Sequence, residues 1–245
     1  MLLFYNIGRY ILLLKTIFTK PENGKLLVKR TFYEMNSIGI ESLGIISMIS
    51  VFMGMVMTIQ SAYQIVSPLL PDSVFGAVVT NSSLLEFSTT VSALVLAGRV
   101  GSNISSEIGN MKISEQIDAL EVMGINSANY LILPKIVAGL IVFPLLVIVS
   151  SFLCIGGGMF IGNFLGIVSY ADFIDGAQSS FETFTLTFAL MKSITFAFII
   201  TSVSSYQGFF VKGGSLEVGR ASTRAVVHSS IFILLFDYIL AQLFL

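Results

Sequence analysis

Three acidic residues recur at every third position in a polar stretch between two long apolar runs. The acids are Glu115, Asp118 and Glu121, and an apolar set with the same spacing is Ile117, Leu120 and Met123. Residues three apart share one face of a helix, so the pattern predicts a short helix with an acidic and an apolar side. Such a helix can dock into a groove on another protein. A capped surface hairpin without a partner explains the spacing equally well.

A second set of polar residues lies inside the apolar runs, where each charge is costly and a candidate functional group. Lys192 and Asp237 each lie about eight residues, or roughly 12 Å, from the end of a run. Equal depth and opposite charge predict an ion pair, with snorkelling of Lys192 to the interface as the alternative. Glu86 lies nearer a run end, where solvation explains it equally well. Gln60 could face a cavity or bond a neighbouring helix.

Other chemistry is poorly supported by the residues. One cysteine, Cys154, and one histidine, His228, cannot form a disulfide or supply a four-ligand zinc site. No second group accompanies His228 at a spacing that would support hydrolysis. The Gly-Lys dipeptide of a Walker A loop occurs only at Gly24-Lys25, where Leu26 follows instead of Ser or Thr. We therefore expect no catalytic residues, no bound metal and no cofactor, and any ATP would be bound by a separate subunit.

The composition indicates a membrane protein. Of 245 residues, 55% are hydrophobic and 11% charged, and the mean hydropathy is +0.90. Ordinary soluble domains carry about 25% charged residues. These values exclude a soluble enzyme and a disordered chain. The net charge of −1 argues against a nucleic-acid partner, because phosphates are held by clustered Lys and Arg.

Five apolar runs are each long enough to span a bilayer, which takes about 20 residues. They cover residues 43–66, 82–100, 132–160, 184–209 and 226–245. The sequence therefore predicts an all-α, polytopic membrane protein that forms one domain over residues 1–245. We expect Pro134, Pro144 and the glycines at 156–158 to kink the third run or end it early.

Basic residues predict the orientation, because Lys and Arg concentrate in cytoplasmic loops. Six of the thirteen lie within residues 1–40, three lie in or beside the loop at 101–131, and three lie between the last two runs. The loops at 67–81 and 161–183 contain none. The N-terminus is therefore predicted to be cytoplasmic and the C-terminus to lie outside.

Two segments complete the expected fold. The first 18 residues lack the basic start and cleavage site of a signal peptide, and we expect residues 1–40 to form interfacial helices; a sixth span is the alternative. Within the loop at 101–131, Ser114 is the expected N-cap of a helix from Glu115 to Met123 that ends at Gly124. Gly109 and Asn110 are expected to separate this helix from the stalk before it.

Three stretches of the sequence resemble one family. They are AGRVGSNISSEIGNMKISEQIDALEVMGINSANYLILPK at 97–135, KSITFAFIITSVSSYQGFFVKGGSLEVGRASTRAVVHS at 192–229, and SVFMGMVMTIQ at 50–60. All are similar to the MlaE-type (YrbE-like) permeases, the membrane subunits of bacterial ABC transporters that move phospholipids between inner and outer membranes and so act on outer-membrane lipid asymmetry.

The resemblance implies a homodimeric permease of the bacterial inner membrane, with five transmembrane helices, an N-terminal interfacial helix and a cytoplasmic coupling helix. It implies a cytoplasmic ABC ATPase, a periplasmic MCE-type lipid-binding subunit and phospholipid as partners. The ATPase-coupling residues would be Glu107, Met111, Glu115, Gln116, Asp118, Leu120, Glu121 and Met123. The intramembrane polar residues near a lipid cavity would be Gln60, Glu86, Lys192 and Asp237.

One stretch departs from the family pattern. Family members usually read close to RELGP where this chain has Leu85-Glu86-Phe87-Ser88-Thr89, so any role of that arginine is in doubt here. Two other functions remain compatible with the residues. An ion-coupled secondary transporter would use intramembrane charges, and a non-transporting scaffold would use the loop to recruit a cytoplasmic partner.

Overall fold

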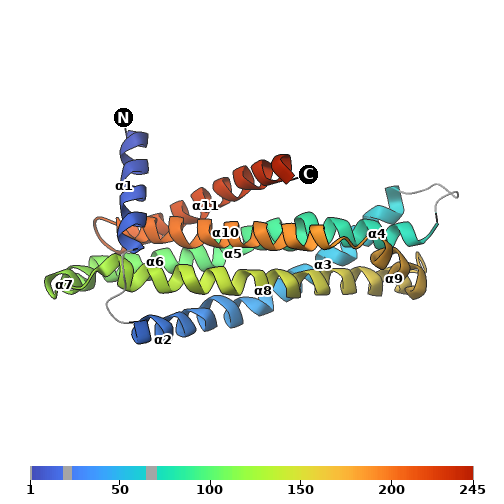
Figure 1. Ribbon diagram of the computed structural model, residues 1–245, viewed down its shortest axis with the longest axis horizontal. Coiled ribbons are helices and arrows are strands. Elements are labelled where there is room, and N and C mark those ends of the chain that lie inside the picture. The colour runs from blue at the N-terminus through green and yellow to red at the C-terminus, as the bar shows by residue number, and fades with distance from the viewer. Residues whose placement is uncertain (1, 19–23, 65–70, 245) are drawn as a thin grey trace. The chain divides into compact units, whose positions relative to one another are not determined.

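The computed structural model describes residues 2–18, 24–64 and 71–244, and this part of the chain contains helices and short connections but no strand (Figure 1). Five of its helices are long and apolar enough to cross a membrane. They are Gly24–Gln64, Ser73–Ile113, Ser127–Phe164, Thr183–Phe209 and Ser215–Phe244. The prediction of an all-α polytopic membrane protein is therefore confirmed.

The N-terminal region forms two helices. Helix α1 spans Leu2–Ile17, and its 16 residues are fewer than the roughly 20 that a span needs. In Figure 1 it lies crosswise to α6 (Ser102–Ile113), and its place in the membrane interface stays a prediction. Helix α2 (Gly24–Met35) instead continues through a π-helical turn, η1 (Asn36–Ile40), into α3 (Glu41–Gln64). The second half of the expected interfacial region thus belongs to the first spanning helix.

The second spanning helix alternates between α-helical and π-helical turns. It consists of α4 (Ser73–Ser82), η2 (Ser83–Val91), α5 (Ser92–Leu96), η3 (Ala97–Gly101) and α6. π-Helical turns are rare and occur frequently at functional sites. The first two spanning helices contain three such turns, so the residues in these turns are candidates for functional roles.

The third spanning helix, α8, runs without interruption over Ser127–Phe164. The expectation that prolines and glycines end it early is wrong. Gly157 packs against the backbone of Val51 in α3, and Gly158 packs against Thr58. These glycines allow two helices to approach closely, and membrane helices tolerate prolines when neighbouring groups bond the freed backbone.

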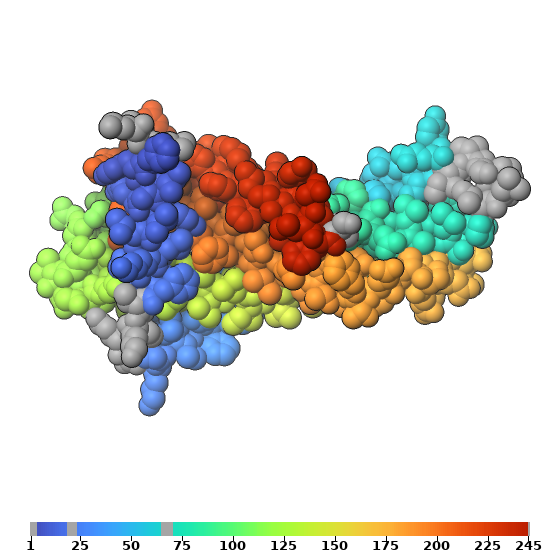
Figure 2. Space-filling model, turned by 45° about the horizontal axis from the view of Figure 1, so that its top comes forward, coloured from blue at the N-terminus to red at the C-terminus, as the bar shows by residue number. Residues whose placement is uncertain are grey.

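The remaining elements are α7 (Gln116–Val122), α9 (Tyr170–Ser179), α10 (Thr183–Phe209) and α11 (Ser215–Phe244). The N-terminus of α9 is capped by Ser169, whose hydroxyl accepts from the backbone N–H of Asp172. Helix α11 keeps large apolar side chains exposed along its second half, and part of it is visible on the face drawn in Figure 2.

The chain forms two compact units, each assembled from three segments. The first contains residues 1–42, 94–142 and 194–238, and the second contains residues 43–93, 143–193 and 239–245. The second unit has an apolar cluster of Phe75, Val79, Val168 and Phe173. Beside it α4 and α9 approach so closely that a Cβ atom on Gly176 would overlap the carbonyl of Ser73. That one permease domain covers 1–245 stays a prediction.

Candidate coupling site and intramembrane ion pair

The loop helix α7 forms where the acidic repeat predicts it, but it begins differently. Ser114 is not its N-cap, because the serine closes α6 and its hydroxyl donates to the carbonyl of Asn110 at 2.8 Å. Glu115 precedes α7 in the left-handed conformation, with φ of 59°, and caps no backbone N–H. Helix α6 also continues through Gly109 and Asn110, so the expected break there is wrong. Gly109 packs against Val218 instead.

The C-terminal end of α7 matches the expectation. Gly124 takes a positive φ of 79°, which only glycine adopts without strain. The backbone N–H of Ile125 donates to the carbonyl of Leu120 at 3.0 Å, which closes the end of the helix. The turn fixes where α7 stops and where the chain turns back into α8.

The two faces of α7 are less uniform than the spacing predicts. Ile117 is fully buried, whereas Met123 is 65% exposed, so the apolar stripe divides between the packed side and the surface. The three acids are exposed. Asp118 accepts from Lys112 at 2.5 Å, and Glu121 accepts from the hydroxyl of Ser127.

A buried lysine joins the stalk α6 to two other helices. Lys135 in α8 is 2% exposed, and its Nζ lies 2.7 Å from both Glu34 Oε1 in α2 and Glu107 Oε2 in α6. Glu34 is 14% exposed and Glu107 is 46% exposed. One cation therefore balances two carboxylates and holds α2, α6 and α8 together next to the loop.

Helix α1 is attached to the start of α8 by two side-chain amides. Asn129 donates to the carbonyl of Ile17 at 2.7 Å, and Asn126 donates to that of Thr16 at 3.2 Å. These bonds satisfy carbonyls that every helix C-terminus leaves unpaired. Tyr10 of α1 also bonds the hydroxyl of Ser202 at 2.7 Å. Burial raises the pKa of Tyr10, against a smaller lowering by this bond, so the phenol stays neutral at pH 7.

In the second unit, a buried cation meets the π-helical turn η2. Lys192 is fully buried, and its Nζ lies 2.8 Å from the carbonyl of Leu85 and 3.2 Å from Glu86 Oε1. Glu86 Oε2 accepts from Thr90 at 3.2 Å. The side chain of Thr89 also donates to Leu85, so the wide turn presents this carbonyl to two side-chain donors.

The four intramembrane residues singled out by sequence are thus only partly brought together. Lys192 contacts Glu86, an acid for which the sequence alone leaves solvation at a helix end as an equal explanation. Asp237 is partly buried on α11 and belongs to the other unit, and its pairing with Lys192 stays a prediction. Gln60 is exposed on α3.

Comparison with known proteins identifies the family. A family model described as Permease MlaE matches residues 31–243. The chain belongs to the MlaE permease family. It is 33% identical over 228 residues to the intermembrane phospholipid transport system permease protein MlaE of Haemophilus influenzae, covering 91% of this chain and 85% of that one.

Two further relatives extend the comparison. A probable ABC transporter permease protein of Rickettsia bellii is 34% identical over 229 residues, which is 94% of this permease and 86% of the relative. The chloroplastic protein TRIGALACTOSYLDIACYLGLYCEROL 1 of Arabidopsis thaliana is 30% identical over 221 residues, 90% of this chain and 63% of that one. The family resemblance noted in the sequence is thereby confirmed.

Sequence reasoning missed several residues of the permease that the structure brings together. Glu34 carries no pattern signal, and Lys135 and Arg99 were used only as markers of orientation. Arg30 stacks on the ring of Tyr130 at 3.6 Å and donates to the Tyr130 carbonyl at 3.0 Å. The only available signal was a set of charges at the ends of apolar runs, which does not say which charges meet.

Proposed function

We propose that this chain is the permease subunit of an ABC-type transporter that moves phospholipids between inner and outer membranes, driven by a separate ATPase subunit. The observation that carries the proposal is the family match over residues 31–243, which includes both the spanning helices and the loop with α7. Relatives named as ABC permeases and as an intermembrane phospholipid transport permease support it. The chain has no Walker A pattern, so the nucleotide would be bound elsewhere.

We propose α7 as the contact for that ATPase. Its three acids are exposed, as are Val122, at 89%, and Met123, at 65%. An exposed apolar tip beside acidic groups suits a groove with an apolar floor and a basic rim. The proposed coupling set also includes Glu107, Met111, Gln116 and Leu120. Glu107 would transmit movement of α6 to α2 and α8 through Lys135.

Purification from native membranes tests this contact. We expect an ATPase to co-purify with the wild-type permease and to be lost when Glu115, Asp118 and Glu121 are together changed to Lys. The control is Asp175→Lys, which reverses one exposed acid on α9, away from α7 in the sequence. Recovery of the triple variant with undiminished ATPase would contradict the assignment of α7.

We also propose a homodimer that uses the exposed apolar face of α11. Ile231 is 54% exposed, Leu234 53% and Tyr238 69%, and Figure 2 shows this helix at the surface. A periplasmic MCE-type lipid-binding subunit is the proposed receiver of the lipid. The N-terminus would be cytoplasmic and the C-terminus periplasmic, in the bacterial inner membrane, which the distribution of basic residues supports.

The intramembrane residues Gln60, Glu86, Lys192 and Asp237 would lie along the lipid path. The polar contacts of buried Lys192 support this role, because an intramembrane cation is retained at a cost. Lys192→Asp and Asp237→Lys are each expected to reduce transport, and the double variant is expected to recover it if the two side chains pair. A double variant no better than either single one would contradict the pairing.

One observation favours ion coupling as a second candidate function, namely the contact of a buried lysine with a half-exposed carboxylate, Glu86. Transport without an ATPase, driven by a proton or sodium gradient, would support that candidate and contradict the ABC assignment.

A further inference from the structure

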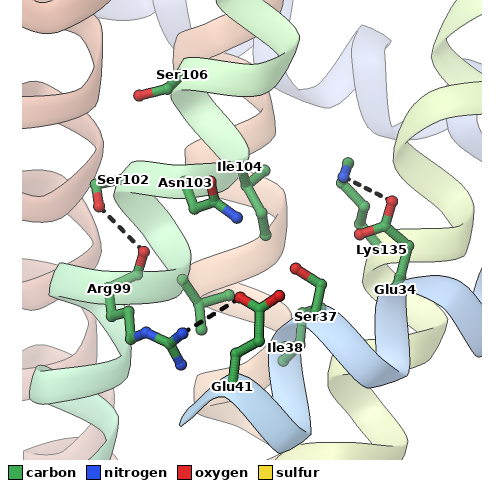
Figure 3. Close-up of a pocket in the computed structure, with 11 residues that line it drawn as sticks. Glu34, Ser37, Ile38, Glu41, Arg99, Ser102, Asn103, Ile104, Ser106 and Lys135 are labelled. Atoms are coloured by element: carbon green, nitrogen blue, oxygen red, sulfur yellow. Dashed lines mark hydrogen bonds and ion pairs between the residues drawn. The ribbon is translucent and has the colours of Figure 1, made fainter.

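A polar pocket of about 410 Å³ lies in the first unit, between the start of the first spanning helix and the end of the second. Two ion pairs flank it, Glu41 with Arg99 at 3.3 Å and Glu34 with Lys135 at 2.7 Å (Figure 3). Its volume falls within the range of about 300–1,000 Å³ typical of ligand sites. None of its lining residues belongs to the Lys192 contact in the other unit.

Two walls of the pocket are π-helical turns. Ser37 and Ile38 belong to η1, whereas Arg99 and Val100 belong to η3. Well under 1% of residues in soluble proteins are π-helical, and such turns occur frequently at functional sites. Two π-helical turns from separate helices that line the same pocket point to a binding site rather than a packing gap.

The charged side chains in the pocket keep both hydrogen-bond donors and hydrogen-bond acceptors that their ion pairs do not use. Arg99 donates to Ser42 at 2.6 Å and to Glu41 Oε2 at 3.3 Å, which uses two of the five N–H donors that a guanidinium carries. Glu34 and Glu41 each have a second carboxylate oxygen beyond the one in the ion pair. Figure 3 shows the side-chain amide of Asn103 in the space between the two pairs.

We propose that this pocket binds the zwitterionic headgroup of a phospholipid, with its phosphate on Arg99 and Asn103 and its ammonium between Glu34 and Glu41. The pocket lining offers groups of both signs, which matches a ligand that carries one charge of each sign; Glu107, outside the lining, shares Lys135 with Glu34. Arginine suits phosphate because its planar fork donates two parallel hydrogen bonds. The inference rests on the proposed function for the presence of lipid but adds a site to it.

A lipid headgroup and free inorganic phosphate share the phosphate chemistry that Arg99 and Asn103 would bind, and the probes of the following experiment distinguish the two sources.

The test is native mass spectrometry of the purified complex titrated with three probes. These are dihexanoyl phosphatidylethanolamine, dihexanoyl phosphatidylglycerol, which lacks the ammonium, and inorganic phosphate. We expect saturable binding of one phosphatidylethanolamine per permease chain, about tenfold weaker binding of phosphatidylglycerol, and no displacement by phosphate, since one lost charge-assisted bond costs about this factor. Displacement by inorganic phosphate would show a site for anions alone and overturn the proposal.

Two variants and one control locate the binding. Arg99→Gln removes the phosphate partner, and Asn103→Trp fills the space while leaving both ion pairs intact. Each is expected to weaken phosphatidylethanolamine binding by about tenfold. Arg220→Gln breaks the exposed pair with Glu217 on α11 and is expected to bind like wild type. Unchanged binding in Asn103→Trp overturns the proposal even if Arg99→Gln fails to fold.

The same samples separate this inference from the proposed function. If an ATPase co-purifies with the variants and their lipid binding is unchanged, the result would support the transporter assignment and contradict the proposed headgroup site. If the wild-type permease binds phosphatidylethanolamine with the expected preference over phosphatidylglycerol and phosphate, but never binds an ATPase, the result would support the headgroup site and contradict the transporter assignment.

Discussion

Replacing Lys135 with Met tests the junction of α2, α6 and α8. The substitution keeps the apolar stem and removes a cation that is 2% exposed, which leaves the carboxylate of Glu34 buried without its partner. Breaking a buried ion pair from one side costs about 3–5 kcal/mol. Because Glu34 keeps 14% exposure, we expect about 3 kcal/mol. Glu107 is 46% exposed and solvates readily, so its share is small.

This loss of unfolding free energy converts to a lower melting temperature. For a chain of this size, 1 kcal/mol corresponds to about 2–4 °C, so Lys135→Met should melt about 6–12 °C below wild type. Adding Glu34→Gln removes the unpaired charge and should recover more than half of the loss. Lys112→Met breaks an exposed pair with Asp118 and should shift the melting temperature by less than about 3 °C.

The composition of the chain selects the assay. The sequence contains no Trp, so tryptophan fluorescence cannot report unfolding, but its single cysteine, Cys154, is 1% exposed. A thiol-reactive dye therefore gains signal only when the helices around Cys154 open, and far-UV circular dichroism measures the loss of helix in parallel. A melting temperature within 2 °C of wild type for Lys135→Met, or no recovery on adding Glu34→Gln, would refute the reasoning.

Two further predictions use the same assay or a related one. Gly157→Ala should lower the melting temperature by several degrees, because the added Cβ would overlap the carbonyl of Val51. Gly156→Ala meets open space and should be neutral or stabilise the fold by about 0.5–1 kcal/mol. Equal effects of the two substitutions would contradict the packing of α8 on α3. Asn129→Ala should free the C-terminus of α1 by leaving the Ile17 carbonyl unpaired, at a cost of about 1–3 kcal/mol, and limited proteolysis should then cleave α1 faster, with an unchanged rate counting against the attachment.

The sequence predicts those features of the fold that depend on neighbouring residues. A long apolar run predicts a membrane-spanning helix from its own residues alone. Gly124 ends α7 as expected, because the positive φ at the helix end depends only on the residue at that position. The prediction that Ser114 caps the N-terminus of α7 is wrong, because its hydroxyl donates to the carbonyl of Asn110 in the preceding helix. A serine at this position suits both bonds, so the sequence pattern does not distinguish them. The π-helical turns give no periodic signal, since they shift each hydrogen bond by one residue.

The candidate sites depend on contacts between distant parts of the chain, which spacing cannot reveal. Glu34 and Lys135 are 101 positions apart and Glu86 and Lys192 are 106 apart, yet each pair forms an ion pair. The sequence named Asp237 as the partner of Lys192 by depth, and that pairing stays a prediction; the contact of Lys192 with Glu86 was found only in the structure. Charge and depth predict that a partner exists, but several acids satisfy the same condition.

The most direct test of the central claim is the movement of phospholipid by the purified complex. The permease and its co-purified ATPase would be reconstituted in proteoliposomes that contain a labelled phospholipid, and transfer of label to a soluble acceptor would be followed with ATP and with a non-hydrolysable analogue. We predict transfer that requires hydrolysable ATP and is lost on charge reversal at Glu115, Asp118 and Glu121. Equal transfer with the analogue, or transfer driven by an ion gradient alone, would contradict the account.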